Sequence, residues 1–211
     1  MTDIIFEDSS IIVCLKPAGV QSQGGKNDLV ARLDEYFKDS NAKAYPVHRL
    51  DKETAGIMVF AKTQQAAAKL SAQISCNEMK KHYFAVAQGR PDADSAVLKD
   101  LLFHDRQKNK TYTVKRVRKG VKEASLEYKV VGVSGELTML DILLHTGRTH
   151  QIRVQFASRK MPLYGDGKYG GGSGNLALFA YKLEFKHPET NERLCFSALP
   201  QKESAPWNEF D

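Results

Sequence analysis

The sequence of 211 residues lacks the features of a membrane protein or a secreted protein. No apolar run approaches the roughly 20 residues that a membrane-spanning helix needs. The N-terminal stretch "MTDIIFEDSS" carries acids and has no basic lead into an apolar region, so it does not read as a signal peptide. Cys14, Cys76 and Cys195 are too few and too far apart for a disulfide framework or a metal-ligand pair. We therefore expect reduced thiols and a cytoplasmic protein without a membrane partner.

Motifs for metals and nucleotide cofactors are also missing. The chain has six histidines, but none stands in an HExxH pattern or a similar ligand spacing. His145 and His150 are five residues apart, which suits one helix face poorly. There is no Walker A loop, and the GxG in "GDGKYG" does not connect a strand to a helix. The sequence thus predicts neither a metal site nor a bound nucleotide.

Positive charge, by contrast, is present in excess. Lys and Arg number 31 against 25 Asp and Glu, which gives a net charge of +6 and favours polyanionic partners. The basic segment Arg106–Lys122 contains eight Lys or Arg and no acid, so it more than accounts for this excess. Tyr112 stands among these cations, as in many single-strand binders, although a solvated basic hairpin has the same composition. We expect this segment to contact nucleic acid.

Apolar runs and turn residues predict more strands than helices. The predicted strands are Ile11–Leu15, Ile57–Ala61, Tyr83–Ala87, Leu126–Val131, Leu137–Leu144 and Leu176–Phe185. The predicted helices are Leu29–Lys38 with Asp28 as N-cap, Gln64–Ile74, and Thr149–Arg159 with Thr149 as N-cap. The tract Tyr169–Gly174 reads as a flexible glycine loop. Because strands and helices do not alternate strictly, we expect a single α+β domain over residues 1–211. Its core would be a mixed, largely antiparallel sheet flanked by helices and loops.

One short polar cluster, His48-Arg49-Leu50-Asp51, stands just before the apolar run Ile57–Ala61. An ordinary solvated turn or a surface ion pair would explain it. A carboxylate nucleophile or base beside an arginine would explain it equally well, because the cation keeps the acid ionised. Gly56, directly before the run, would allow the backbone to approach a ligand closely.

A second cluster follows Gly147, where Arg148, His150 and Arg153 bring cations to the start of a predicted helix. Such a helix start suits phosphate or carboxylate groups. Arg148 and Arg153 are five residues apart and therefore diverge by about 140° around the axis. One could hold RNA backbone while the other points inward at a buried acid, although a charged helix face is the simpler reading. Tyr83 in "KKHYFAVAQG", taken alone, reads as a core strand tyrosine.

Taken together, these clusters resemble the signature motifs of the RluA-type pseudouridine synthases. The resemblance is carried by "VHRLDKETAGIMVFAKT", "KKHYFAVAQG" and "TGRTHQIRVQFASRKMPLYGDGKYG". It extends to the opening "IIFEDSSIIVCLKPAGV" and to the late strand "LALFAYKLEFKHP", so it spans Ile5–Phe196 in the family's order. Gln155 and Phe179 stand where many members have histidine, and Gln21–Gly25 replaces a Val-His-Pro loop. None of these departures touches the catalytic set.

The resemblance implies an RNA isomerase that converts specific uridines of structured ribosomal or transfer RNA to pseudouridine. It implies that Asp51 is the essential carboxylate, that Arg153 pairs with it, and that Tyr83 stacks on the flipped-out base. It also implies a reaction without metal or organic cofactor. We expect a monomer whose RNA contacts come from residues within the motifs and the basic segment: His48, Arg49, Arg106, Lys108, Lys110, Lys115, Arg116, Arg148 and His150.

Two other functions are compatible with parts of the sequence. A non-catalytic basic RNA-binding protein would need only the basic segment Arg106–Lys122, and the intact HRLD stretch argues against it. A glycosidase or nucleosidase would need a second acid beside Asp51. Glu53 is available for that role, but nothing else marks it.

Overall fold

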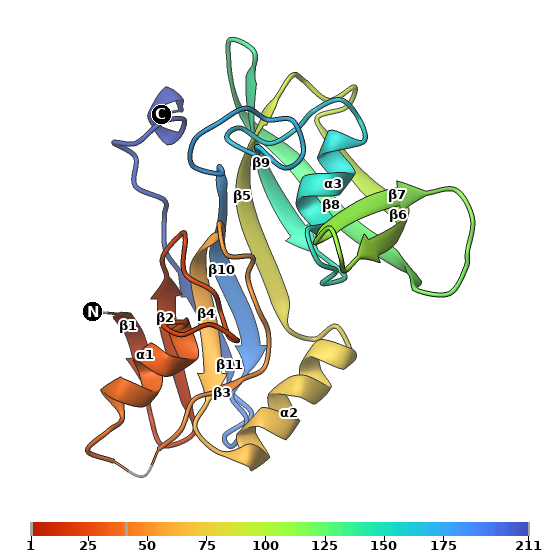
Figure 1. The fold of residues 1–211 in the computed structure, drawn as a ribbon. Helices are drawn as coiled ribbons and strands as arrows, with labels where there is room; N and C mark the ends of the chain where they lie inside the picture. Colours follow the sequence, from red (N-terminus) through yellow and green to blue (C-terminus); the bar gives the residue numbers. More distant parts are fainter. Residues whose placement is uncertain (1, 41, 211) are drawn as a thin grey trace. The chain divides into compact units, whose positions relative to one another are not determined.

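The structure is a computed structural model that describes residues 2–40 and 42–210. The chain divides into two compact units. Unit 1 contains the described residues up to Lys81 together with Ala180–Ala198, and unit 2 contains His82–Phe179 together with the described residues from Leu199 onwards. Figure 1 shows the elements of each unit. The single domain predicted over residues 1–211 stays a prediction.

Unit 1 is built on a sheet whose strands run in the order β1-β2-β4-β10, with β3 beside β4 and β11 beside β10. Their bounds are β1 Asp3–Glu7, β2 Ile11–Lys16, β3 Tyr45–Pro46, β4 Ala55–Ala61, β10 Leu178–Lys186 and β11 Arg193–Ser197. Strand β2 pairs antiparallel with both β1 and β4. The antiparallel sheet expected from the sequence is confirmed in this unit.

The central strands β2 and β4 are apolar on both faces. Ile57, Val59 and Ala61 alternate along β4 with Met58 and Phe60, and all five are buried. Side chains at alternate positions point to opposite faces of a sheet. Strand β4 is therefore covered on both sides, which explains why its sequence is a continuous apolar run instead of an alternating one.

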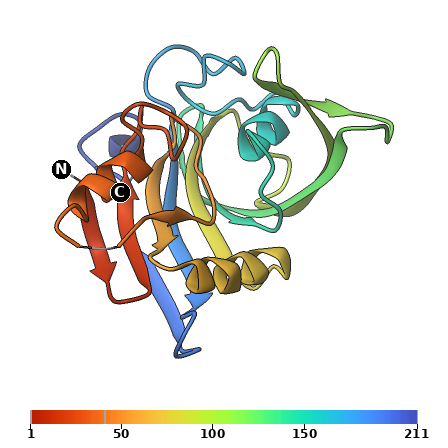
Figure 2. The same cartoon turned by 60° about the horizontal axis from the view of Figure 1, so that its bottom comes forward.

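Two helices accompany the strands of unit 1, as Figures 1 and 2 show. Helix α1 covers Leu29–Tyr36, and Asp28 caps it by accepting the Ala31 N–H. Helix α2 covers Gln64–Ser75, and Thr63 caps it in the same way. Its buried face, which includes Leu70, packs into the same core as one face of β2 and β4. The predicted Asp28 cap and both helices are confirmed.

Unit 2 contains an antiparallel sheet with the strand order β5-β9-β8-β6-β7. The bounds are β5 Lys80–Gln88, β6 Ser95–Asp105, β7 Lys110–Val114, β8 Val121–Ser134 and β9 Leu137–Leu144. A register shift between Val130 and Gly132 interrupts the pairing of β8 with β9. Figure 2 shows that these strands curve around helix α3. The chain's short 3-10 turn at Trp207–Glu209 also belongs to this unit.

Helix α3, Gln151–Ala157, differs from its prediction at both ends. Thr149 is not its cap. His150 occupies the N-cap position in a left-handed backbone conformation (φ 54°), with no side-chain cap bond. The Gln151 side chain holds the loop before the helix, because its Oε1 accepts the Arg148 N–H at 3.0 Å. Residues from Gln151 to Phe156 are all buried, so the helix lies inside the sheet's curve instead of carrying a solvent face.

All six predicted strands are present, although β8 begins five residues before its predicted start. In the part of the chain that the structure describes, five strands were missed: β1, β3, β6, β7 and β11. None of the helices in the described part of the chain is long and apolar enough to cross a membrane.

Candidate active site

The HRLD stretch forms the turn between β3 and β4 in unit 1, and Asp51 is half-buried within it. The turn is closed by the Thr54 N–H, which donates to the Asp51 carbonyl at 3.1 Å. The next carbonyl, that of Lys52, accepts the Gly19 N–H at 2.8 Å from the loop after β2. The backbone on both sides of the Asp51 carboxylate is thus fixed by hydrogen bonds.

Ser22 holds the residue before Asp51 in place. Its hydroxyl accepts the Leu50 N–H at 3.0 Å and donates to the Leu50 carbonyl at 2.9 Å. Ser22 is only 4% exposed, so both groups of Leu50 would be buried without a partner if the hydroxyl were absent. The loop "QSQGG", which departs from the family pattern, therefore contributes directly to the shape of the Asp51 turn.

His48 ties the start of the turn to strand β4. Its Nε2 accepts the Val59 N–H at 3.1 Å, which requires an unprotonated nitrogen at that position. Burial of the ring, together with the charge of Lys81, lowers the pKa of His48 to about 3. The Nδ1 atom is covered and makes no hydrogen bond in the described structure. His48 is therefore a neutral anchor for the turn rather than a cationic phosphate ligand.

Lys16, at the end of β2, is a buried cation beside the Asp51 turn. Its Nζ donates to the carbonyls of Pro17 at 2.9 Å, Val20 at 2.7 Å and Lys52 at 3.1 Å. The residue is 1% exposed. Burial lowers the pKa of Lys16 to about 8, and the charges of Asp51 and Glu53 partly oppose this shift. All three ammonium protons thus have carbonyl partners, and the side chain joins the loop after β2 to the Asp51 turn.

Gly56, the second residue of β4, allows a close backbone approach. A Cβ at this position would collide with the backbone of Ala180 in β10. Its φ of +131° also lies in a region that L-residues avoid. The glycine expected to admit a ligand instead admits a neighbouring strand, which sets where the chain leaves the Asp51 turn.

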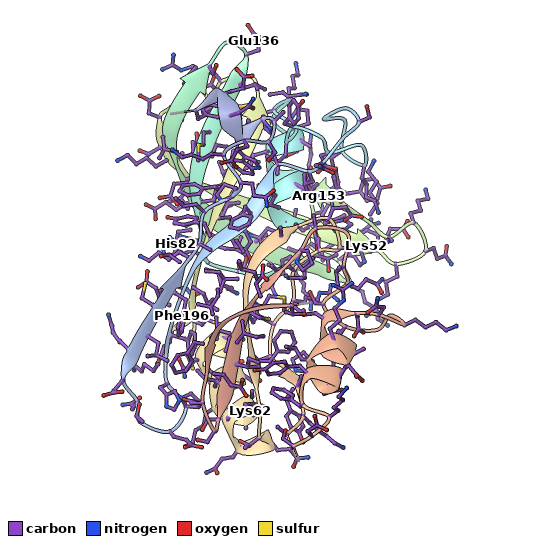
Figure 3. All side chains as sticks on the ribbon, turned by 90° about the vertical axis from the view of Figure 1, so that its left-hand side faces the viewer. Lys52, Lys62, His82, Glu136, Arg153 and Phe196 are labelled. Atoms are coloured by element: carbon purple, nitrogen blue, oxygen red, sulfur yellow. The ribbon has the colours of Figure 1, made fainter. Side chains whose placement is uncertain are left out.

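In unit 2, Arg153 lies on helix α3 and points at a buried acid, as one of the two arginines was predicted to do. Its Nε and Nη2 donate to the two oxygens of Asp166, both at 2.8 Å. The two side chains are 3% and 0% exposed. Figure 3 labels Arg153 beside its helix. A fork-to-fork pair of this kind fixes the guanidinium in position and in rotation.

Both members of the Arg153–Asp166 ion pair also contact Tyr169, the first residue of the tract Tyr169–Gly174. Asp166 Oδ1 also accepts the N–H of Tyr169 at 3.3 Å, and the Tyr169 ring lies 5.3 Å from the guanidinium carbon of Arg153. Gly171 is buried with its α-carbon against the Leu163 carbonyl, where a Cβ would not fit. Tyr169 and Gly171 are thus hydrogen-bonded and Gly171 is packed, whereas Gly170 between them is exposed. The flexible loop expected over Tyr169–Gly174 stays a prediction.

The Tyr169 hydroxyl connects α3 to the basic segment. It lies 2.9 Å from His150 Nδ1 and accepts the Thr111 N–H at 2.8 Å. Burial is the main cause that raises the pKa of Tyr169. Lys110, the first residue of β7, places its Nζ 5.3 Å from the centre of the same ring. His150 is thus 7% exposed and engaged inside the unit, although it was expected to contact RNA.

Of the remaining predicted residues, Arg49 is exposed in unit 1 and the others lie in unit 2. Tyr83 is on β5, opposite Ile142 of β9, and is 6% exposed. Arg148 precedes α3, and its Nε donates to the Glu123 carbonyl at 2.9 Å. The basic segment forms the β6–β7 turn, strand β7 and the loop before β8. Four of its predicted RNA contacts are exposed and Lys110 is half-buried: Arg106, Lys108, Lys110, Lys115 and Arg116.

Asp51 and its neighbours therefore lie in unit 1, whereas Tyr83, Arg148, His150 and Arg153 lie in unit 2. The pairing of Arg153 with Asp51 stays a prediction. Sequence reasoning missed Lys16, Ser22, Asp166 and Tyr169 as parts of these clusters. The expectation that an inward arginine needs a buried acid was a usable signal for Asp166, which lies 13 residues further along the same motif.

Comparison with known proteins gives concordant results. The family model described as RNA pseudouridylate synthase matches residues 10–158. An uncharacterized RNA pseudouridine synthase of Bacillus subtilis is 37% identical over 93% of this chain and 68% of its own length. Ribosomal large subunit pseudouridine synthase D of Xanthomonas campestris is 34% identical over 93% of this chain and 65% of its own length. The chain thus spans about two thirds of the length of these relatives.

Solved structures show the same fold. The human protein titled RNA Pseudouridylate Synthase Domain Containing 4 superposes with a TM-score of 0.81 over 98% of this chain and 90% of its own, at 20% identity. Human RNA Pseudouridylate Synthase Domain Containing 1 gives a TM-score of 0.80 over 98% of this chain and 86% of its own, at 19% identity. At such identities the likeness concerns the α+β fold.

Proposed function

The chain belongs to the RNA pseudouridylate synthase family, and from this premise we propose that it isomerises specific uridines of structured ribosomal or transfer RNA. The observation that carries the proposal is the Asp51 turn. Its carboxylate is half-buried, its backbone is bonded on both sides, and a buried cation lies next to it. A solvated turn would need none of these supports.

The isomerisation breaks the bond between the ribose C1′ and uracil N1, turns the base, and forms a bond from C1′ to C5. A carboxylate near the sugar can attack the anomeric carbon or remove a neighbouring proton, and Asp51 supplies that group in either route. The hydrogen displaced from C5 is balanced by a proton gained at N1. Because the detached uracil must be recaptured, the apolar wall formed by β4 behind the turn supports the assignment.

Residues of unit 2 complete the proposal. Tyr83 stacks on the flipped base, and Arg153 pairs with Asp51 in the assembled site. Extruding a base costs a few kcal/mol, which stacking and phosphate contacts offset. The exposed cations of the basic segment, with Arg49 and Arg148, would supply phosphate contacts. The proposal includes a monomeric enzyme that needs no metal and acts in the cytoplasm, where its RNA substrates would be found.

The test of the proposal is turnover on RNA by the wild-type protein and by Asp51→Asn. The substitution keeps the size of the side chain and removes its charge, so we expect RNA affinity within about 3-fold of wild type and a loss of more than about 10⁴-fold in rate. Pseudouridine is measured in total ribosomal and transfer RNA after incubation. A folded wild-type protein that forms none on any cellular RNA, or an Asp51→Asn variant at the wild-type rate, overturns the proposal.

The basic segment is tested separately by replacing Lys108, Lys115 and Arg116 with Gln. Each cation that contacts a phosphate releases counterions on binding. We expect the triple variant to bind RNA about 10-fold more weakly near physiological salt and with a shallower salt dependence. The matched control replaces three exposed lysines outside the segment, Lys26, Lys69 and Lys202. Equal losses in both variants would contradict a specific role for the segment.

A further inference from the structure

The guanidinium of Arg153 is held from two directions by residues to which the sequence analysis assigned no role. Asp166 binds its Nε–Nη2 edge through two bonds of 2.8 Å. The guanidinium also lies over the Tyr169 ring, with 5.3 Å between the guanidinium carbon and the ring centre. The carboxylate and the ring together fix the position of an arginine that otherwise has several freely rotating bonds.

Asp166 also builds the turn that carries Tyr169. Its Oδ1 accepts the N–H of Lys168 at 3.2 Å and of Tyr169 at 3.3 Å. Its carbonyl accepts the N–H of Tyr169 at 3.1 Å and of Gly171 at 2.8 Å. One fully buried carboxylate therefore places both the arginine and the ring that lies against it.

The Tyr169 hydroxyl extends this arrangement to the hairpin of β6 and β7. It accepts the N–H of Thr111, whose own hydroxyl donates to the Thr149 carbonyl at 2.8 Å. Lys168 adds a bond from its Nζ to the Asn109 carbonyl at 2.9 Å. The basic hairpin, the start of α3 and the Arg153 guanidinium are thereby parts of one bonded structure within unit 2.

We propose that Asp166 and Tyr169 are positioning residues for the reaction, which fix the Arg153 guanidinium and connect it to the RNA-binding hairpin. This inference rests on the proposed function, in which Arg153 acts on Asp51. A displacement of about 1 Å in a group that acts on the reacting atoms can cost 100-fold in rate. The two residues act on rate through Arg153 and do not themselves touch RNA.

The first experiment compares Asp166→Asn with Asp100→Asn under single-turnover conditions. Asp100 is a matched control, because it also binds an arginine through both oxygens in unit 2, Arg159 at 2.9 and 3.2 Å. We expect Asp166→Asn to lower the rate by roughly 10- to 100-fold with RNA affinity within about 3-fold. Asp100→Asn should lower the melting temperature without a comparable loss of rate. Equal effects of the two variants on rate overturn the proposal.

A double-mutant cycle with Arg153→Lys separates positioning from a general structural role. If Asp166 acts through the guanidinium, Asp166→Asn should cost less than about 3-fold further when Arg153 is already Lys. Multiplicative losses in the double variant would show that Asp166 acts on the rate by another route, and they would overturn the inference. Melting temperatures of the four proteins show whether stability follows the same pattern.

Two variants of Tyr169 provide a further test. They test the positioning proposal even if the Asp166→Asn protein does not fold. Tyr169→Phe keeps the ring against the guanidinium, whereas Tyr169→Leu removes it. We expect Phe to lose about 3-fold in rate, because the hydroxyl bonds to Thr111 and His150 are absent, and Leu to lose about 10-fold, the order of a buried cation–π contact. Equal rates for the two variants overturn the role of the ring. A wild-type protein without activity rejects the proposed function instead, so the two failures are distinguishable.

Discussion

The two units hold their key charged residue by different means. In unit 1 the main chain that carries the Asp51 carboxylate is fixed by bonds at Leu50, Asp51 and Lys52. In unit 2 the Arg153 guanidinium is placed by side chains, through Asp166 and Tyr169. The Asp51 side chain has only two rotatable bonds, so fixing its backbone leaves few positions for its oxygens. The guanidinium is at the end of a long chain and needs contacts at its tip.

This difference predicts where each unit is sensitive to substitution. Unit 1 should respond to changes that move the main chain of the Asp51 turn, even where no side chain near the carboxylate is altered. Unit 2 should tolerate comparable backbone changes and respond to the loss of single polar groups around Arg153. Three predictions test the sensitivity of unit 1, from the largest expected effect to the smallest.

Gly56→Ala should have the largest effect. The new Cβ would collide with the Ala180 backbone, and alanine at a φ of +131° is strained in any case. We expect a loss of more than about 3 kcal/mol in the free energy of unfolding, measured by urea denaturation. Strand β4 would have to move away from β10, and the Asp51 turn would move with it.

Gly135→Ala in unit 2 is the matched control for this change. Gly135 lies between β8 and β9 with a φ of +54°, and a Cβ there would meet no atom within 4 Å. The cost should be about 1 kcal/mol, with no change in RNA turnover. Similar losses for the two glycine variants would show that the left-handed backbone alone is responsible, and that the close approach of β4 to β10 adds nothing.

Lys16→Met should have an intermediate effect. Methionine has a similar length but leaves the carbonyls of Pro17, Val20 and Lys52 without their donor. Because removing a buried charge recovers part of this cost, we expect a net loss of about 2 kcal/mol, or about 4 to 8 °C in melting temperature. Single-turnover rate should fall as well, since the Lys52 carbonyl directly follows Asp51.

Lys62→Met gives the control for the lysine substitution. Lys62, labelled in Figure 3 with Lys52, also belongs to unit 1 and is mostly buried, but its Nζ donates to Glu7 and to the Asp8 carbonyl, both at 2.6 Å. The Lys62→Met variant should be less stable than the wild type but keep its single-turnover rate within about 2-fold. A Lys16→Met protein that melts earlier but turns over normally would show that the Asp51 turn does not depend on this support.

The sequence predicted β2 and β4 of unit 1 because they are continuous apolar runs buried on both faces. It missed the short strands β1, β3 and β11 of the same unit. It missed β6 and β7 because the hairpin interrupts its apolar residues with charges, Lys99 and Asp100 in β6 and the cations around β7. Such residues are tolerated where a strand has a solvent-facing side or lies at the edge of the sheet. Local composition therefore indicated a basic hairpin as an alternative to a nucleic-acid contact, but it did not predict strands β6 and β7.

Within the candidate site, sequence reasoning identified charged residues but not most of the groups that hold them. The inward arginine called for a buried acid, and the structure supplies Asp166. Ser22 was not predictable in the same way, because its partner Leu50 is 28 residues away and the Ser22 hydroxyl bonds to the backbone of that residue, not to its side chain. His48 was expected to contact RNA because it belongs to the HRLD motif. Its role as a neutral anchor follows only from the approach of the Val59 N–H.

That anchor predicts the smallest of the three effects, a pH dependence that is specific to unit 1. Folding lowers the pKa of His48 from 6.5 to about 3, because the ring is buried and lies near the Lys81 charge. Between pH 3 and pH 6.5, His48 is therefore largely protonated in the unfolded chain and neutral in the folded protein. The stability contributed by neutral His48 is therefore complete above about pH 6.5 and is lost as the pH falls toward 3.

The His48→Gln variant isolates this effect, because glutamine can accept the same N–H and does not titrate. The two proteins should differ little in pH dependence above pH 7, whereas from pH 6.5 to 5.5 the wild type should lose up to about 1 kcal/mol more. Taking the difference between the variants cancels the titration of groups that they share. Parallel profiles from pH 7.5 to 5 would mean that His48 is protonated in the folded protein. Its Nε2 would then be a donor, the bond from Val59 could not form, and the Asp51 turn would lack its anchor on β4.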